Sequence, residues 1–140
     1  MKVFIEPGAF LPERAYDLDA GFDLRAMEAI TIPPHSHVVV HTGVHIELPE
    51  NTAGILISKS GLNTKFGVTS TGLIDEGYTG EILVPLHNNG DLPFVVSKEQ
   101  KISQLVITSI FRPKLELVES CEAFKKSDRG NSGFGSTGAF

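Results

Sequence analysis

Short apolar runs separated by turn-forming residues dominate the hydrophobic pattern of this chain. Residues 38–48 are rich in β-branched side chains, and after residue 40 they alternate between apolar and polar, as a half-buried strand does. Further short apolar runs cover residues 55–57, 82–86, 94–96 and 102–107. Proline, asparagine and glycine punctuate the intervals between them. No stretch sustains a 3.6-residue apolar period, so we predict no long helix and an all-β sandwich or barrel.

Length and composition agree with one folded domain. The chain has 140 residues and a mass of 15.1 kDa, with 41% hydrophobic and 21% charged residues. These are ordinary values for a globular protein and argue against a wholly disordered chain. The 14 glycines and 8 prolines suit a fold with many turns, which supports the all-β prediction.

Charge and cysteine content exclude several classes of function. The formal net charge is −5 and the pI about 5.5, so no global attraction draws the chain to nucleic acid or to an anionic membrane. A single cysteine, Cys121, excludes an intramolecular disulfide and a multi-cysteine zinc site. No apolar run approaches the ~18 residues that span a bilayer, and the first residues show no secretory signal. We therefore expect a cytoplasmic protein.

The last residues differ in kind from the rest. Residues 127–140 contain too little apolar surface to fold alone, so we predict a core over residues 1–126 and a flexible C-terminal segment over 127–140. This segment combines Arg129, several glycines, and the hydroxyls of Ser136 and Thr137, all of which are donors suited to phosphate. The ring of Phe134 suits stacking on a base. The pattern predicts a lid over a nucleoside polyphosphate, and a disordered Gly/Ser tail is the alternative.

A candidate general base lies in residues 72–82. Asp75 stands between the apolar end of a strand and a glycine-containing turn, a place from which a carboxylate can orient a water. Tyr78, three residues further on, offers a flat ring against a sugar. The alternative is a β-hairpin whose acidic residues only cap the turn.

Three other places carry candidate ligand-binding side chains. Lys59, Ser60 and the Gly61 amide form a compact set of donors suited to phosphate, with a solvated turn as the alternative. Asp23 suits the water shell of a phosphate-bound Mg²⁺, and its alternative role is a turn cap. Lys101 and Gln104, in a predicted strand, either enter a site or face solvent.

The histidines give a weaker signal. His41 and His45 have the spacing of one strand face, as do His35 and His37, but no cysteine or carboxylate cluster accompanies them in the sequence. We therefore expect surface or interface residues, with a zinc site as an alternative of low weight.

Taken in order along the chain, five segments resemble the five motifs of the trimeric dUTP nucleotidohydrolases (dUTPases). They are AGFDL at residues 20–24, KSGL at 59–62, GLIDEGYTGE at 72–81, KISQL at 101–105 and RGNSGFGSTG at 129–138. The resemblance runs from residue 20 to residue 138, and its third and fifth segments are the most specific.

This resemblance implies a β jelly-roll fold and a homotrimer whose active sites are shared between subunits. It implies hydrolysis of dUTP to dUMP and pyrophosphate with Mg²⁺, which limits uracil in DNA and supplies dUMP for thymidylate synthesis. Asp75 would orient the water that attacks the α-phosphorus, and Tyr78 would pack on the deoxyribose. The other implied substrate-binding residues are Lys59, Ser60, Gly61, Thr71, Gly72, Ile74, Lys101, Gln104, Arg129, Phe134, Gly135, Ser136 and Thr137. Asp23 and Gln104 would reach the metal through water.

The chain departs from the family pattern in places. Lysine stands at positions 59 and 101, where arginine is usual, which keeps the charge but loses the planar fork. Gly77 replaces a common acidic residue, and residues 69–71 (Thr-Ser-Thr) stand where many members have an asparagine near the uracil. The alternatives to a dUTPase are a dCTP deaminase of the same fold, a dUTP-binding regulatory protein, and an oligomeric jelly roll that binds no nucleotide.

Overall fold

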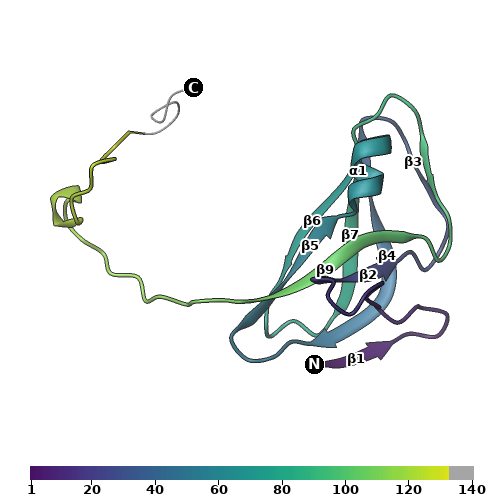
Figure 1. Cartoon of the computed structure of the whole chain (residues 1–140), viewed down its shortest axis with the longest axis horizontal. Coiled ribbons are helices and arrows are strands. Elements are labelled where there is room, and N and C mark those ends of the chain that lie inside the picture. The colour runs from purple at the N-terminus through teal and green to yellow at the C-terminus, as the bar shows by residue number, and fades with distance from the viewer. Residues whose placement is uncertain (133–140) are drawn as a thin grey trace.

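A curled antiparallel sheet forms the body of the protein in the computed structural model, which describes residues 1–132 (Figure 1). Its strands, in chain order, are β1 (Lys2–Ile5), β2 (Gly21–Arg25), β3 (Ile30–Ile32), β4 (Ser36–Glu47), β5 (Thr52–Ser58), β6 (Val68–Ile74), β7 (Glu81–Asn88), β8 (Phe94–Val96) and β9 (Lys101–Ser109). The helix α1 (Ser60–Phe66) lies between β5 and β6, and a 3₁₀ turn, η1 (Cys121–Ala123), follows β9. The large sheet has the order β1-β4-β7-β6-β5-β9-β2, and β3 pairs with β8 separately. This confirms the all-β, jelly-roll-like fold.

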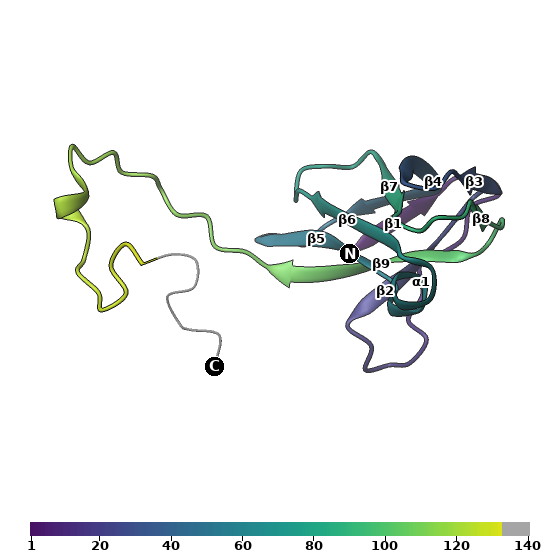
Figure 2. The ribbon, with the colours of Figure 1, turned by 90° about the horizontal axis from the view of Figure 1, so that it is seen from above.

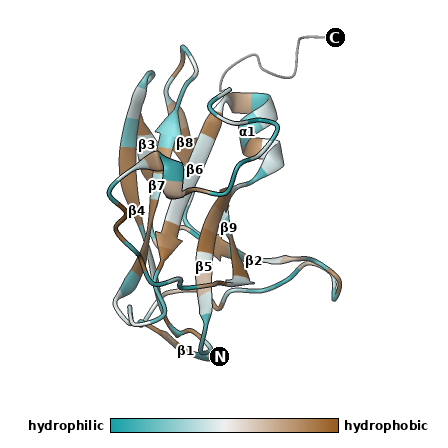
Figure 3. Ribbon diagram, turned by 90° about the vertical axis from the view of Figure 1, so that its left-hand side faces the viewer, coloured by the Kyte–Doolittle hydropathy of each residue, from teal (hydrophilic) through white to brown (hydrophobic). Residues whose placement is uncertain are grey.

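The strand β6 joins the two halves of the large sheet. Residues 68–70 pair with β7, whereas residues 71–74 pair with β5. Because β6 changes neighbours along its length, the sheet folds back on itself, and Figure 3 shows β4 and β7 facing β5 and β9 across the interior. The apolar side chains between the halves form the core, among them the fully buried Leu24, Ile82 and Leu105.

The strand predictions from the apolar runs are confirmed, but the pattern does not reveal every element. The five runs lie in β4, β5, β7, β8 and β9. The apolar runs do not mark the short strands β2 and β3. They also miss β1, whose four residues are all exposed, and β6, whose sequence VTSTGLI is half polar. The pattern also treats residues 58–62 as a turn, whereas α1 begins at Ser60 and ends at Phe66, followed by the cap residue Gly67 with a left-handed φ of 67°.

The chain after β9 leaves the body. Residues 110–132 extend away from the sheet in both views (Figures 1 and 2), and almost all of their side chains are exposed. The exposed fractions of Leu115 and Leu117 are both 98%. We call residues 110–126 the arm.

Among residues 1–132, the structure contains no helix that is both long and apolar enough to span a membrane.

Candidate active site

The turn between β6 and β7 forms one wall of a pocket that holds the candidate base. A hollow of about 450 Å³ lies elsewhere, but this pocket, of about 330 Å³, is the one lined by Asp75 and Tyr78. The remaining lining residues are Leu56, Gly72, Leu73, Ile74, Glu81, Leu83 and Pro85. Its volume lies within the range of ~300–1,000 Å³ that is usual for small-molecule sites. Asp75 is exposed to solvent and directly follows the last residue of β6.

Groups within the hairpin and outside it fix the turn. The Tyr78 N–H donates to the Asp75 carbonyl at 3.0 Å, which closes the turn. Next to Asp75, the Glu76 carboxylate pairs with Arg112 and accepts from the Asn51 N–H at 2.9 Å. The Arg112 guanidinium beside Glu76, helped by the Asn51 N–H, lowers the pKa of that carboxyl. The turn that carries Asp75 is therefore tied to the first residues of the arm.

A second cluster joins Asp23 to two lysines. The carboxylate of Asp23, 4% exposed, pairs with the ammonium of Lys59 and, at 2.6 Å, with that of Lys101. Burial raises the pKa of Asp23, but hydrogen bonds and charge from the two lysines outweigh burial, and the pKa is lowered. The cluster carries a net positive charge at neutral pH, as a phosphate site requires.

Cross-strand pairing places three of the candidate residues in one row. Asp23 on β2 pairs with Gln104 on β9, Gln104 pairs with Ile57 on β5, and Ile57 pairs with Thr71 on β6. Directly opposed residues share one face of a sheet. Asp23, Gln104 and Thr71 therefore lie in one row, whereas Gly72 and Ile74 line the pocket beside Asp75.

The first residues of α1 leave room beside the lysines. Ser60 and Gly61 are exposed, and a Cβ built on Gly61 would meet no atom within 4 Å. Lys59 directly precedes them, so these three candidate phosphate ligands lie together with Asp23 and Lys101.

Within one chain, the structure does not bring the lysine cluster to Asp75. In the antiparallel pairing of β5 with β6, Gly54 lies opposite Ile74, which places Asp75 beside position 53. Lys59 is six residues further along, or roughly 20 Å at ~3.3 Å per residue. Within one chain, the lysine cluster and Asp75 are therefore separated by most of the length of β5.

Of the C-terminal candidates, Arg129 is the one that lies within the described residues. Arg129 is exposed in the segment beyond the arm, where its Nε donates to the Ser132 carbonyl at 3.1 Å. Phe134, Gly135, Ser136 and Thr137 lie outside the described residues.

Sequence reasoning missed the carboxylates that pair with the histidines. His41 Nδ1 lies 2.9 Å from a Glu81 carboxylate oxygen, and His45 Nε2 lies 3.1 Å from one of Glu6. Each hydrogen bond to a carboxylate raises the pKa of its histidine. The partners come from β7 and from the segment after β1, so only the sheet pairing brings them close. Among residues 1–132, no group of three or more side chains of His, Cys, Asp or Glu is placed to hold a metal.

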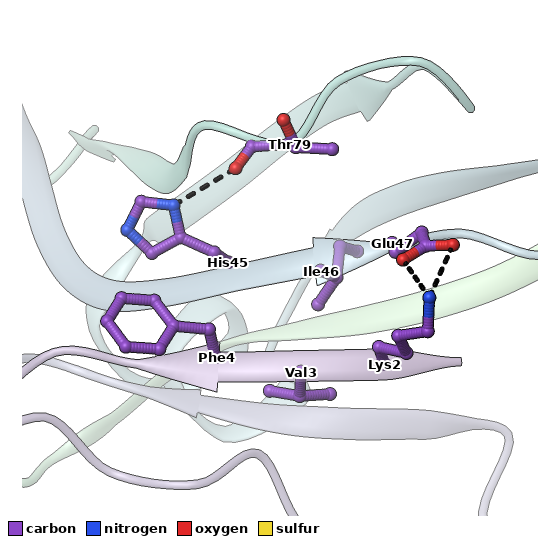
Figure 4. A pocket seen from close by; sticks show the side chains of 7 residues that line it. All are labelled: Lys2, Val3, Phe4, His45, Ile46, Glu47 and Thr79. Atoms are coloured by element: carbon purple, nitrogen blue, oxygen red, sulfur yellow. Dashed lines mark hydrogen bonds and ion pairs between the residues drawn. The ribbon is translucent and has the colours of Figure 1, made fainter.

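The hollow of about 450 Å³ lies over the edge formed by β1 and β4 (Figure 4). Phe4 and Val3 form its apolar floor, and a Lys2–Glu47 ion pair closes one side. On its other side, His45 Nδ1 lies 3.1 Å from the carbonyl of Thr79, which belongs to the turn after Asp75. Within residues 1–132, no phosphate-ligand candidate lines this hollow.

Comparisons with known proteins identify relatives along nearly the whole chain. The dUTPase family model matches residues 8–138. The deoxyuridine 5'-triphosphate nucleotidohydrolase of Clostridium tetani (strain Massachusetts / E88) is 44% identical over 137 residues, covering 96% of this chain and 92% of that protein.

Solved structures agree with the sequence relatives. The dUTPase of Staphylococcus bacteriophage 80alpha, solved with dUPNHPP, has a TM-score of 0.90 at 31% identity and covers 98% of this chain and 97% of its own. A mutant dUTPase from phage phi11 of S. aureus, whose structure shows the coordination of a structural Mg(II) ion, has a TM-score of 0.79 at 30% identity. That alignment covers 86% of this chain and 97% of the phage protein.

Proposed function

The chain belongs to the dUTPase family and is a dUTP diphosphatase, and from this premise we propose how its residues hydrolyse dUTP to dUMP and pyrophosphate. The observation that carries the proposal is the pocket in which Asp75 and Tyr78 meet on one turn. Its walls from β6 and β7 would hold the deoxyuridine, with Gly72 and Ile74 beside the base and the Tyr78 ring against the sugar.

Asp75 acts as the general base in this proposal. Its exposed carboxylate accepts a proton from a water whose oxygen bonds to the α-phosphorus, while the bond from that phosphorus to the pyrophosphate oxygen breaks. Hydrolysis at phosphorus depends mainly on an oriented nucleophile and on neutralised charge. The anchoring of Glu76 by Arg112 and Asn51 supports this role, because it fixes the turn that aims Asp75.

The lysine cluster supplies the charge that binds the triphosphate. Lys59, Ser60, Gly61 and Lys101 would contact the phosphates, with the two lysines moving from Asp23 towards the substrate. The donor set forms no cage for a cation, and it fits a Mg²⁺ that arrives on the phosphates and keeps its waters. Asp23 and Gln104 would accept hydrogen bonds from those waters, and the ion would neutralise phosphate charge.

We propose a homotrimer, and the separation of Lys59 from Asp75 within one chain supports it. The arm supports it as well, because it alternates apolar and polar residues from Phe111 to Leu117 in the pattern of a strand. Phe111, Leu115 and Leu117 are at least 88% exposed in the single chain. A neighbouring copy that covers the arm would bury this surface and bring Arg129 towards another subunit's site.

Residues 127–140 would then close over the bound nucleotide as a lid, after a core of residues 1–126. Arg129, Ser136, Thr137 and Gly135 would contact phosphate, and Phe134 would stack on the uracil. A cytoplasmic role in limiting dUTP and supplying dUMP for thymidylate synthesis stays a prediction.

A regulatory role is the second candidate, favoured by one observation. Solved relatives from Staphylococcus bacteriophage 80alpha are described as dUTPases that control the transfer of virulence genes by a G protein-like mechanism. A protein partner that this chain retains only with a non-hydrolysable dUTP analogue, in a pull-down with purified components, would support that role here.

The substitution Asp75→Asn tests the proposed mechanism. We expect pyrophosphate release from dUTP with Mg²⁺ to fall about 10²–10⁴-fold, because the base is lost. Binding of a non-hydrolysable dUTP analogue, measured by calorimetry, should persist.

The matched control is Asp91→Asn, which removes an exposed carboxylate that pairs with His35. We expect it to keep the parent rate. Parent-like turnover by Asp75→Asn would show that another group activates the water.

A further inference from the structure

The ring of Tyr78 lies directly against the backbone of Gly80. A Cβ built on Gly80 would stand 2.5 Å from the tyrosine Oη, 2.6 Å from Cζ and 2.9 Å from Cε2. All three distances are shorter than the closest approach of real Cβ atoms, so any residue other than glycine at position 80 would displace the ring. The three nearest contacts all belong to Tyr78.

The tip of the ring is held as well. Tyr78 Oη donates to the Glu81 carbonyl at 2.8 Å. The Glu81 carboxylate in turn accepts from the Gly43 N–H at 2.8 Å and from the Thr42 N–H at 3.1 Å, and it pairs with His41. These bonds tie the start of β7 to Thr42 and Gly43 of β4. The carbonyl that accepts from the tyrosine hydroxyl is therefore itself fixed.

We infer that Gly80 is a positioning residue that sets the pose of the Tyr78 ring and thereby the selectivity for deoxyribose over ribose. The inference rests on the proposed function, in which Tyr78 packs on the sugar. A ring that rejects a 2′-hydroxyl by contact must be held in place, because a mobile ring would move aside for the extra oxygen. Gly80 allows the ring to lie flat on the backbone, and the Glu81 carbonyl prevents it from swinging away.

The geometry makes this role separable from folding. Gly80 has no positive φ, so alanine is compatible with its backbone conformation. The atoms that would clash form the far end of a single, 45% exposed side chain, so the ring can move without disturbing the core.

The same turn offers a matched control. Gly77 also lacks a positive φ, and a Cβ there would meet no atom within 4 Å. Gly80→Ala and Gly77→Ala therefore make the same change in chain flexibility three residues apart, but only the first displaces Tyr78.

The test compares kcat/KM for dUTP and for UTP in the parent and both variants. We expect Gly80→Ala to lower the dUTP-to-UTP ratio about tenfold, and Gly77→Ala to keep it within about twofold. In a Tyr78→Ala background, adding Gly80→Ala should change the ratio no further. A parent-like ratio in Gly80→Ala, or an equal loss in Gly77→Ala, would overturn the inference. Absence of dUTP cleavage by the parent would instead contradict the proposed function.

A spectroscopic measurement tests the ring pose without activity. The chain has two tyrosines and no tryptophan, so in a Tyr16→Phe background Tyr78 alone gives the tyrosine band in near-ultraviolet circular dichroism. We expect Gly80→Ala to change that band and Gly77→Ala to leave it unchanged. An unchanged band in Gly80→Ala would mean that the ring keeps its place, which would also overturn the inference.

Discussion

At the scale of single residues, Asp23 has the most unusual environment. Among residues 1–132 it is the one charged residue that is buried, and it bridges Lys101 on β9 and Lys59, which directly precedes α1. A buried carboxylate is stable as an anion only when positive partners compensate for lost hydration. Asp23 therefore keeps the two lysines close together before any substrate arrives.

The variant Asp23→Asn should reduce stability at neutral pH by about 1–3 kcal/mol, because it leaves two half-buried ammonium groups beside each other. The folded-state pKa of Asp23 is lowered, so its contribution is present above its ordinary pKa near 3.9 and is lost as pH falls through the lowered value. Urea unfolding at pH 7 and pH 3, at one protein concentration, checks both effects. The parent should lose more free energy of unfolding over this interval than the variant, and equal losses would contradict the assignment.

At the scale of elements, an ion pair joins the β6–β7 turn to the arm. The turn itself is short and exposed. It is held by Arg112, the third residue of the arm, and by Asn51, which directly precedes β5. A catalytic carboxylate on a loop acts well only when neighbouring groups hold the loop. Movement of the arm would therefore reach Asp75 through the Glu76–Arg112 pair.

The substitution Arg112→Ala should lower kcat several-fold and leave the KM for dUTP nearly unchanged, because it loosens the turn that aims Asp75. Steady-state kinetics with dUTP would measure this split. Lys114→Ala is the control, since it removes an exposed positive charge two residues further along the arm. A similar loss in both variants would show that net charge, and not the ion pair, matters.

The C-terminal segment acts as an element of its own in the proposed reaction. Deleting residues 128–140 should lower turnover at least about 100-fold, because phosphate donors that act in the transition state are removed. Pyrophosphate release reports the activity, and gel filtration with thermal melting reports the assembly. Loss of the trimer or of the folded body on deletion would make the segment structural.

At the scale of the whole molecule, a single chain does not bring the proposed phosphate ligands and the proposed base together. The lysine cluster and Asp75 lie at opposite ends of β5 and β6. The arm extends away from the body (Figure 2), and its apolar side chains are exposed. Association of copies would resolve both features together, since it would bury the arm and bring unlike groups from different chains to one nucleotide.

The double substitution Leu115→Asp and Leu117→Asp should therefore separate the assembly into monomers and abolish dUTP hydrolysis. Light scattering after gel filtration should give about three times the 15.1 kDa chain mass for the parent and one chain mass for the variant. The neighbouring Lys114→Asp, which changes a polar position of the alternating pattern, should keep the parent mass. A monomeric parent would contradict the proposed trimer.

The strand β4 could be predicted from alternation in the sequence, because it is buried on one face. The strand β9 was marked by its apolar run instead. The same reasoning could not find β1 or β6. All four residues of β1 are exposed in one chain, and β6 carries Thr69, Ser70 and Thr71 where a core strand would carry apolar side chains. Ser70 is buried, and its hydroxyl shares a hydrogen bond with that of Ser103 on β9. This partner is 33 residues away, and no local pattern indicates it.

The order of five short motifs along the chain was enough to indicate the dUTPase family, because it resembles the order of that family's motifs, and each motif contains residue types suited to phosphate, sugar or base. Which of these groups meet was decided only by tertiary structure. Sheet register placed Asp23 between Lys59 and Lys101, and the return of the chain placed Arg112 beside Glu76. The pose of Tyr78 on Gly80 is likewise a contact of folded backbone with side chain. The ion pairs of Asp23 and of Glu76 depend on distances between segments remote in sequence, which the pairing of strands sets and the local pattern does not record.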